Sequence, residues 1–311
     1  MEYIKNTTDF HISENTVVSL GKFDGIHRGH GRLLEYLEEK RKEGLKTVIF
    51  TFDIPPGWRL NSPQEGKLLT TNEEKRQLLE RHGIDYLVEC PFTPEIMRME
   101  PEDFVEQTVR RLHIKSFVVG TDFRFGHNRK GDYRLLQKLA GQYGYDLKVV
   151  DKRQEDGRDI SSTFIREEIL AGRLKKANRL LGYPYFVQGT VVHGNEIGGA
   201  KLGIPTANLI LPGEKLLPPF GVYVTRTTVC GIEHGVYGGI SNVGCKPTIA
   251  GENPVGVETH LLEFGEEIYG KQIWVEFLEK VRDEMRFGSL QELKEQMERD
   301  IAYAKEALMR D

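Results

Sequence analysis

The 311-residue sequence has only three cysteines, Cys90, Cys230 and Cys245, and no two of them form a CxxC pair. An odd, scattered set of this kind argues against a disulfide framework and against a thiolate zinc site. Free cysteine is commonly a core residue in proteins. We therefore expect three reduced thiols, buried or half-buried.

Long hydrophobic runs and an excess of one charge are also missing. No stretch approaches the roughly 20 apolar residues of a membrane span, and the first 15 residues contain no apolar run typical of a signal peptide. We expect a cytoplasmic protein that does not associate with membranes. The net charge is −4, which argues against a nucleic-acid binder because such proteins usually carry a strongly basic surface. A local basic site for phosphates remains open.

The composition is that of a globular protein, with 39% hydrophobic and 29% charged residues. At roughly 150 residues per domain, the length predicts two domains that each bury a core. We place the boundary near residues 181–184, where Gly182 is expected to end a helix. The predicted domains are residues 1–182 and 183–311.

The first half alternates short β-branched segments with amphipathic ones, which predicts a parallel α/β sheet wound on both faces. Thr71 with Glu74 forms a capping box, and Pro101 suits the first turn of a helix. Phosphate ligands would bind at the carboxyl ends of the strands. The expected strands are 16–23, 47–52, 85–88, 116–120 and 147–150, and the expected helices include 29–43, 101–112 and 133–143.

The second half has short strands punctuated by glycine, with no helices between them, which predicts a small antiparallel β-barrel or sandwich. The expected strands are 186–192, 221–229, 233–240, 255–262 and 272–278. A C-terminal helix, capped by Ser289 with Glu292, closes the chain. The fold class is therefore an α/β domain followed by a barrel domain.

Residues 21–30, GKFDGIHRGH, lie between the first strand and its helix. Glycines let this turn approach a ligand closely, and the free N–H groups of the following helix favour an anion. His27 and His30 are three residues apart, so they share a face and can donate hydrogen bonds to phosphoryl oxygens. A generic turn with two surface histidines is the alternative, but the position after the first strand favours a functional site.

This segment resembles the HxGH nucleotidylyltransferases, and its longer form GxFDGxHxGH is similar to the FAD synthetase branch. Residues 120–126 with Arg129 and Gly131 resemble the family's GxDFRFG…G motif, and residues 160–166 resemble its SSTxIR motif. The resemblance implies ATP contacts from Gly21, Phe23, Asp24, Gly25, Ser161, Ser162, Thr163 and Arg166, and flavin contacts from Asp122, Phe123, Arg124 and Phe125. Without the resemblance, the DFRFG loop could be a solvated turn. Arg166 is expected in the first turn of a helix, where the dipole disfavours a cation and a bound anion would explain it.

Residues 194–208, GNEIGGAKLGIPTAN, form a second candidate site. Glycines let a loop fold its N–H groups around phosphates. Thr206 and Asn208 are two residues apart, so in extended chain they face the same side, and hard oxygen ligands of this kind suit Mg²⁺. A glycine-rich hairpin without a ligand is the alternative.

LGxPTAN resembles the signature of the riboflavin kinases, and the segments 219–223, 241–244, 257–261 and 269–270 agree with that family. The resemblance makes Glu258 the base that deprotonates the ribityl 5′-hydroxyl; an outward-facing strand residue is the alternative. It implies phosphate contacts from Gly199, Lys201 and Gly203, and flavin contacts from Arg282 and Phe287. Together the two resemblances cover residues 15–305 and imply a bifunctional enzyme that uses Mg²⁺ and ATP to make FMN from riboflavin and then FAD from FMN. FMN and FAD are then substrate and products, not prosthetic groups, and we expect a monomer or weak homo-oligomer.

Two positions depart from the family patterns. Pro55 stands where TFxPHP has its histidine, with Asp53 as a remaining polar contact, and Ala200 stands where GRxLG has arginine, next to Lys201. Lysine lacks the guanidinium fork of arginine, so ATP affinity is in question there. Three alternatives follow: one inactive half, a flavin sensor without catalysis, or an HxGH transferase for phosphopantetheine or nicotinate mononucleotide. The intact His27, His30, Thr206, Asn208 and Glu258 argue against a sensor, and the barrel argues against another acceptor.

Overall fold

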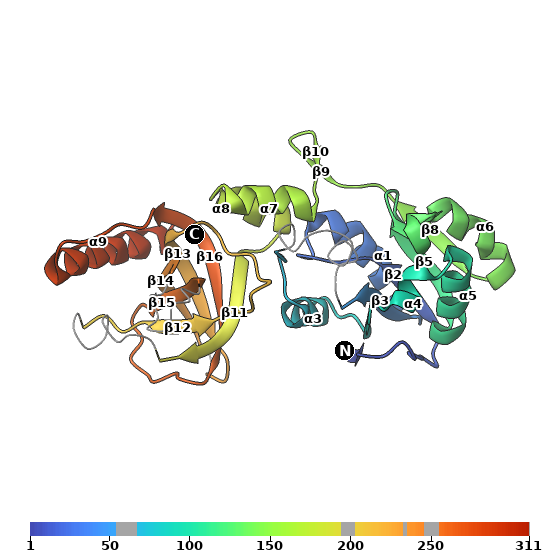
Figure 1. Ribbon diagram of the computed structural model, residues 1–311, viewed down its shortest axis with the longest axis horizontal. Coiled ribbons are helices and arrows are strands. Elements are labelled where there is room, and N and C mark those ends of the chain that lie inside the picture. The colour runs from blue at the N-terminus through green and yellow to red at the C-terminus, as the bar shows by residue number, and fades with distance from the viewer. Residues whose placement is uncertain (54–66, 194–202, 233–234, 246–254, 311) are drawn as a thin grey trace. The chain divides into compact units, whose positions relative to one another are not determined.

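The computed structural model describes residues 1–53, 67–193, 203–232, 235–245 and 255–310. The chain forms two compact units, Met1–Ser162 and Thr163–Asp311 (Figure 1). The predicted boundary at residues 182 and 183 remains a prediction. Pro55, Gly199, Ala200 and Lys201 lie outside the described residues, so the two departures from the family patterns have no structural account.

The first unit is built on a six-stranded sheet in the order β1-β4-β3-β2-β5-β8. All neighbouring strands are parallel, which confirms the predicted parallel sheet. All five residues of β2 are buried, as expected for a strand covered on both faces. The strands are β1 (Glu2–Lys5), β2 (Thr16–Leu20), β3 (Lys46–Phe52), β4 (Tyr86–Cys90), β5 (Ile114–Gly120) and β8 (Asp146–Val150).

Helices cover both faces of this sheet (Figure 1). The helices α5 (Pro101–Leu112) and α6 (Tyr133–Tyr143) share one core cluster with Val18 of β2. The helix α1 (Gly31–Lys42) contacts β2, β3 and β5. The hydroxyl of its residue Tyr36 lies 3.2 Å from the Oγ of Ser116. The doubly wound prediction is thereby confirmed.

The helix starts predicted from the sequence also agree with the structure. The helix α3 (Asn72–Arg81) begins with the predicted capping box of Thr71 and Glu74, and Pro101 is the first residue of α5. A short helix α4 (Pro94–Arg98) precedes α5. Two short pairs of strands were not predicted: β6 (Arg124–Phe125) with β7 (Gly131–Asp132), and β9 (Gln154–Glu155) with β10 (Arg158–Asp159).

The second unit starts with two helices, α7 (Ser162–Leu170) and α8 (Leu174–Leu181), although the first residue of α7 belongs to the first unit by its contacts. As predicted, Gly182 ends a helix, with φ of +89°. The helix α8 packs against β11 and β16 of the barrel. Its residue Asn178 donates to the carbonyl of Phe277 at 2.9 Å and accepts from the amide of Tyr185 at 2.8 Å.

Six antiparallel strands close into a barrel in the order β11-β12-β15-β14-β13-β16, which confirms the barrel rather than the sandwich. The strand β12 was not predicted, and β16 is longer than expected. The predicted start of β14 falls partly on residues 233–234, which lie outside the described part. The strands are β11 (Tyr185–Val192), β12 (Ala207–Ile210), β13 (Gly221–Val229), β14 (Val236–Cys245), β15 (Val255–Leu261) and β16 (Gln272–Arg282).

The last helix, α9 (Leu290–Leu308), lies along β13 and β14 (Figure 1). As predicted, the Ser289 side chain caps it by accepting from the amide of Glu292 at 3.2 Å. Ala304 of α9 is fully buried against Val222, Val224 and Ile240. The helix therefore covers one side of the barrel and packs on it through apolar side chains.

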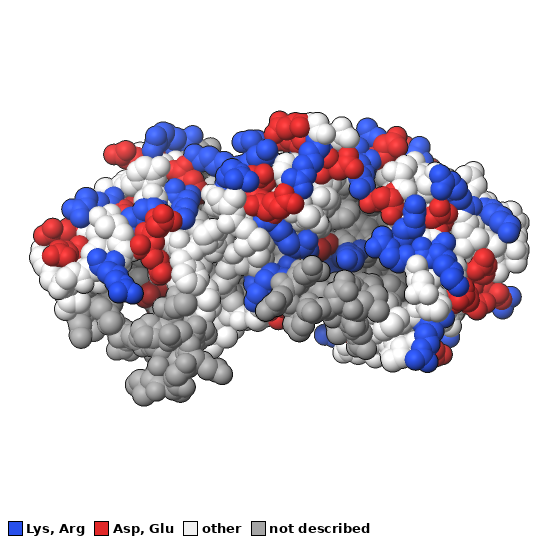
Figure 2. Space-filling model, turned by 45° about the horizontal axis from the view of Figure 1, so that its top comes forward, with Lys and Arg blue, Asp and Glu red and all other residues white. Residues whose placement is uncertain are grey.

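The cysteine prediction is confirmed for Cys90, a free and buried thiol. Cys230, just past the end of β13, is free as predicted but exposed, so only its predicted burial is wrong. Cys230 lies in the turn that follows the strand, outside the barrel core, whereas Val229, the last residue of β13, is buried. On the face seen in Figure 2, acidic and basic side chains are interspersed over the described surface. None of the described helices has the length and apolar character needed to cross a bilayer.

Candidate active sites

The histidine pair of the first site follows the carboxyl end of β2. His27 precedes a single 3₁₀ turn, Arg28–His30, that leads into α1. The two imidazole rings stack with centroids 3.9 Å apart and planes 18° apart, and the His30 ring lies 5.0 Å from that of Phe23. The His30 amide donates to the His27 carbonyl at 2.7 Å. The prediction that both histidines share one face is confirmed.

The loop before the histidines holds an unusual backbone conformation. Phe23 and Ile26 have φ of +48° and +36°, and Gly25 has +86°. For residues with a side chain such angles are strained, and they persist only where the surroundings enforce them. Phe23, Asp24 and Gly25, which were predicted to contact ATP, are buried. Their contacts within the protein determine the shape of the loop.

Asp24 is the centre of the contacts that enforce this shape. Its Oδ1 accepts from the amide of Thr70 at 3.0 Å and from the Thr70 hydroxyl at 3.4 Å. That hydroxyl in turn accepts from the Gly25 amide at 3.0 Å, and Ser162 Oγ donates to the Asp24 carbonyl at 2.8 Å. Thr70 was not predicted from the sequence, because a threonine before a helix cap is common and has no motif of its own.

Gly29 is required by a close approach of the backbone. A Cβ at this position would lie 2.6 Å from the Ile160 carbonyl oxygen and 2.8 Å from the His27 ring. The neighbouring hairpin of β9 and β10 is fixed to the same turn, because Arg28 pairs with Glu155 at 2.6 Å. The glycine of HxGH therefore lets the histidine turn dock against residues 152–160.

Burial determines the charge of His30. Desolvation lowers its pKa to about 4, opposed in part by the negative charge of Asp122. Its Nδ1 is inaccessible to water and has no hydrogen-bond partner among the described residues. At neutral pH the ring is therefore uncharged, and an anion beside it would raise its pKa.

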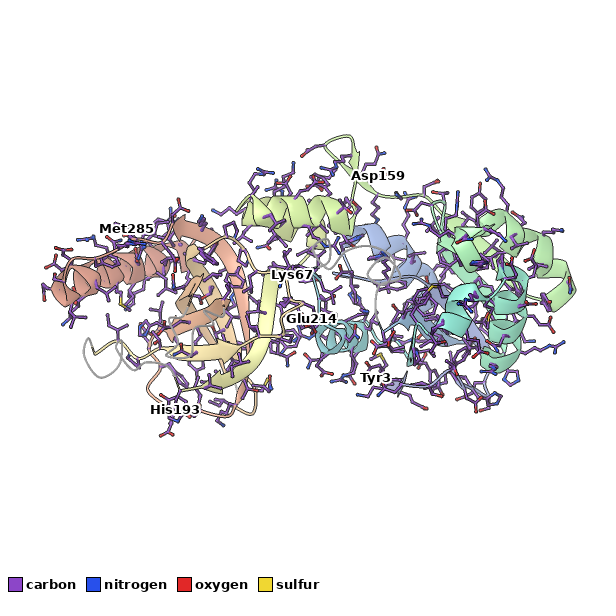
Figure 3. The ribbon with its side chains drawn as sticks, in the orientation of Figure 1. Tyr3, Lys67, Asp159, His193, Glu214 and Met285 are labelled. Atoms are coloured by element: carbon purple, nitrogen blue, oxygen red, sulfur yellow. The ribbon has the colours of Figure 1, made fainter. Side chains whose placement is uncertain are left out.

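The DFRFG segment has mixed roles. Phe125 is buried in the core cluster, and its ring stacks at 5.4 Å on that of Phe123, which is half-buried. Arg124 is exposed. Asp122 pairs at 2.8 Å with Lys152, which also lies 3.4 Å from Asp159, labelled in Figure 3. Of the four predicted flavin residues, Phe125 is the one that the structure uses as core.

The third motif of the first site lies at the start of α7. Ser161 and Ser162 are half-buried and Thr163 is exposed. Arg166 is the fifth residue of α7, one turn later than predicted. The expected conflict between its charge and the helix dipole is therefore wrong, since the dipole effect is confined to the first turn.

In the barrel, a row of polar side chains crosses three neighbouring strands. Asn208 of β12 is paired in register with Glu258 of β15, which is paired with Asn242 of β14. Thr206 donates from its hydroxyl to Glu258 Oε1 at 2.5 Å. Glu258 is half-buried and Asn208 is buried. The structure thus brings together the predicted base and both predicted metal ligands.

These residues fit a magnesium ion. The Thr206 hydroxyl and the Asn208 amide oxygen are hard donors, and Mg²⁺ takes few protein ligands because it keeps waters and substrate phosphates. In the described part of the chain, no group of three His, Cys, Asp or Glu side chains could hold a metal instead. Gly203, with φ of +72°, is exposed at the start of this segment.

The predicted flavin residue Arg282 is held by the last helix. Its guanidinium contacts both carboxylate oxygens of Asp300, at 2.7 to 3.1 Å, and lies 5.9 Å from the ring of Phe287. Asp300 is only 4% exposed and also accepts from Gln296 at 2.7 Å. Sequence reasoning missed Asp300, because one acidic residue in a charged helix carries no signal of its own.

A nucleotidylyltransferase fold with a histidine pair, followed by a barrel that carries a carboxylate beside Thr206 and Asn208, defines an enzyme with two phosphate-transfer sites. A family model of FAD synthetase matches residues 9–164, and one of riboflavin kinase matches residues 181–308. The chain belongs to the bifunctional riboflavin kinase/FMN adenylyltransferase family.

Similar proteins agree along nearly the whole chain. Bifunctional riboflavin kinase/FMN adenylyltransferase from Escherichia coli is 38% identical, covering 94% of this chain and 93% of the relative. That of Bacillus subtilis is 35% identical, covering 92% and 90%. A crystal structure described as a macrolide-efflux protein from Streptococcus pneumoniae superposes with a TM-score of 0.84 at 30% identity, covering 97% of this chain and 98% of that one.

The chain is therefore an enzyme that makes the flavin cofactors FMN and FAD from riboflavin. It phosphorylates riboflavin with ATP to give FMN, and it adenylylates FMN with ATP to give FAD and pyrophosphate. Riboflavin, FMN and ATP are its substrates. Membership in this family argues against an HxGH transferase for another acceptor.

Proposed function

We propose that the barrel performs the kinase step with Glu258 as its general base, and that His27 and His30 serve the adenylylation step in the first unit. The arrangement of Thr206, Asn208 and Glu258 across β12 and β15 is the observation that carries the proposal. It puts a carboxylate next to the two oxygen ligands that would hold a metal–phosphate group. A base within reach of the attacking hydroxyl is what phosphoryl transfer requires beyond positioning and charge neutralisation.

In the kinase step, the 5′-hydroxyl of riboflavin attacks the γ-phosphorus of ATP. Glu258 accepts the hydroxyl proton as the new O–P bond forms, and the bond to the β–γ bridging oxygen breaks to release ADP. The Thr206 hydroxyl donates to Glu258 Oε1 and so orients the carboxylate. Gly199, Lys201 and Gly203 belong to the loop that we assign to the phosphates of ATP.

Thr206 and Asn208 would hold Mg²⁺ in this step. The bound ion neutralises phosphate charge during the transfer. Arg282 and Phe287 are assigned to the flavin, with Asp300 fixing the guanidinium.

In the adenylylation step, a phosphate oxygen of FMN attacks the α-phosphorus of ATP, and the bond to the pyrophosphate oxygen breaks. His27 and His30 stabilise the negative charge that develops on the phosphoryl oxygens. The loop that receives the nucleotide is formed by Gly21, Phe23, Asp24 and Gly25. We assign the triphosphate contacts to Ser161, Ser162, Thr163 and Arg166. We assign the flavin contacts to Asp122, Phe123, Arg124 and Phe125. Phe125 acts from the core, where its ring stacks on that of Phe123.

Two assays separate the two assignments. We expect Glu258→Gln to lower FMN formation from riboflavin by about 10² to 10⁴ and to leave FAD formation from added FMN unchanged. We expect His30→Ala to lower FAD formation by about 10² to 10³ and to leave the kinase step unchanged. Glu266→Gln and His82→Ala, which alter exposed residues, are matched controls. Loss of the wrong half-reaction in either variant would overturn the assignment.

We also propose that the enzyme is cytoplasmic, is a monomer or a weak homo-oligomer, and acts without nucleic acid or membrane. ATP is the donor in both steps, which supports an intracellular location. Cell fractionation tests the location, and sedimentation over a range of concentrations tests the assembly.

A further inference from the structure

His260 lies on β15, two residues after the proposed base Glu258, and neither reaction step uses it. Side chains alternate along a strand, so these two residues share one face of β15. The burial of the strand agrees with this alternation, because Val257, Thr259 and Leu261 are buried whereas Glu258 and His260 are half-buried. The imidazole therefore lies on the side of β15 that carries the kinase site.

The His260 ring is hydrogen-bonded to the main chain that leads into β12. Its Nδ1 lies 2.8 Å from the carbonyl oxygen of Pro205. A carbonyl oxygen only accepts hydrogen bonds, so Nδ1 carries the proton and donates. The pairing of β12 with β15 begins at Ala207, opposite Thr259, and residues 204–206 precede it without regular secondary structure. The histidine thus holds a segment that lies outside the paired strand.

This hydrogen bond fixes the direction in which the chain enters Thr206. The ring of Pro205 sets its φ, and the peptide bond that follows is planar, so the remaining rotation is ψ of Pro205. A donor on the Pro205 carbonyl fixes that rotation. Thr206 follows directly, and its hydroxyl donates to Glu258 Oε1 at 2.5 Å. The strand β15 therefore contacts this segment at two points, through His260 and through Glu258.

We propose that His260 is a positioning residue for the kinase step: its Nδ1–H holds the Pro205 carbonyl, so that Thr206 lies beside Glu258 and Asn208. The strands β12 and β15 that carry Asn208 and Glu258 are neighbours in the barrel (Figure 1). The inference rests on the proposed roles of Thr206 and Glu258 in riboflavin phosphorylation. His260 is assigned no contact with riboflavin or ATP and acts through Pro205 and Thr206.

Three variants of the full-length chain separate the hydrogen bond from the bulk of the ring. His260→Leu removes the donor and keeps a side chain of similar size. His260→Asn keeps a donor, because the asparagine amide nitrogen is bonded to Cγ as Nδ1 is. Gln272→Leu is the matched control, since it removes an exposed side chain of β16 that donates to the Thr190 hydroxyl at 2.7 Å.

We expect His260→Leu to lower kcat for FMN formation by roughly 10- to 100-fold, as misplaced catalytic groups do, with KM for riboflavin changed much less. His260→Asn should recover most of that loss, and Gln272→Leu should match the parent. FAD formation from added FMN should stay constant in all three. Water can replace the donor on a carbonyl at an exposed site, so the urea midpoints should stay close to that of the parent.

A second measurement does not depend on turnover. In ¹⁵N NMR spectra of the parent at about pH 8, the His260 ring should carry its proton on Nδ1, since the two ring nitrogens are distinguished by the hydrogen bonds they make. The spectrum of His260→Asn, which lacks this signal, assigns it. A His260 ring with its proton on Nε2 alone would overturn the inference.

FMN formation within about twofold of the parent in His260→Leu, where positioning effects are far larger, would also overturn it. So would equal losses in His260→Asn and His260→Leu, or failure of His260→Leu to fold. Glu258→Gln separates this inference from the assignment on which it rests. If Glu258→Gln keeps its kinase activity, that assignment is wrong; if it is inactive while His260→Leu is active, only the role of His260 is wrong.

Discussion

Gly29 offers the sharpest test at the scale of a single residue. An added Cβ would lie 2.6 Å from the Ile160 carbonyl and 2.8 Å from the His27 ring, closer than packed atoms approach. We expect Gly29→Ala to displace the histidine turn and to lower FAD formation by roughly 10²-fold. Steady-state rates of both half-reactions check this, because the kinase rate should not change.

Gly141 provides the matched control. It lies within α6, and a Cβ there would meet no atom within 4 Å. Gly141→Ala should keep both activities and stabilise the protein by about 0.5 to 1 kcal/mol, because alanine favours the helix. Full activity in Gly29→Ala would show that the close approach to Ile160 does not matter.

His30 makes stability depend on pH. Its pKa is about 4 in the folded protein, below the ordinary value of about 6.5 in the unfolded chain. The unfolded state therefore takes up the proton first, so the stabilisation is complete above pH 6.5 and is lost as the pH falls toward 4. The full shift corresponds to at most about 3.5 kcal/mol, and to less for a half-buried side chain.

Urea unfolding of the parent and of His30→Gln at pH 7 and pH 5 measures this effect. The parent should lose more stability between the two pH values than the variant does. Equal losses would mean that His30 is not held neutral by burial.

At this scale the sequence indicated the candidate catalytic residues better than the residues that hold them in place. His27 with His30 and Thr206 with Asn208 have distinctive spacing, and Glu258 was indicated by the family resemblance. The structure stacks the two histidine rings and joins Thr206 to Glu258. Thr70 contacts the histidine loop and Asp300 contacts Arg282, each from a distant segment, and a single threonine or aspartate has no spacing that would reveal it. Such contacts depend on tertiary structure alone.

At the scale of elements, α9 is predicted to serve the kinase site through Asp300. Removing this carboxylate in Asp300→Ala leaves Arg282 without the contacts it has at 2.7 to 3.1 Å. We expect a loss of about 1 to 3 kcal/mol in unfolding free energy and a higher KM for riboflavin. The control is Asp283→Ala, whose exposed carboxylate bonds Lys280 at 2.5 Å; it should change stability by less than about 0.5 kcal/mol. An unchanged KM in Asp300→Ala would separate Arg282 from flavin binding.

Long, periodic elements were predicted well, and short ones were not. Residues 133–143 and 221–229 match α6 and β13 residue for residue. The four-residue strand β12 follows a segment rich in glycine and proline, and no strand was predicted there. Its place in the barrel comes from pairing with β11 and β15, which local sequence does not encode.

At the scale of the whole molecule, the helices α7 and α8 raise the question of where the barrel domain begins. Asn178 of α8 bonds both Phe277 and Tyr185 of the barrel. We therefore expect a fragment of residues 163–311 to have a higher thermal midpoint than one of residues 183–311. Kinase rates and thermal unfolding of both fragments check this; equal midpoints would favour the boundary at residues 182 and 183.

The central claim is that one chain carries two working sites. A time course of riboflavin with excess ATP and Mg²⁺, with riboflavin, FMN and FAD separated by chromatography, tests it most directly. The account predicts that FMN rises first and then gives way to FAD, with one pyrophosphate released per FAD. Accumulation of FMN without FAD would contradict it by showing that the first unit is inactive, and unconverted riboflavin would contradict it for the barrel.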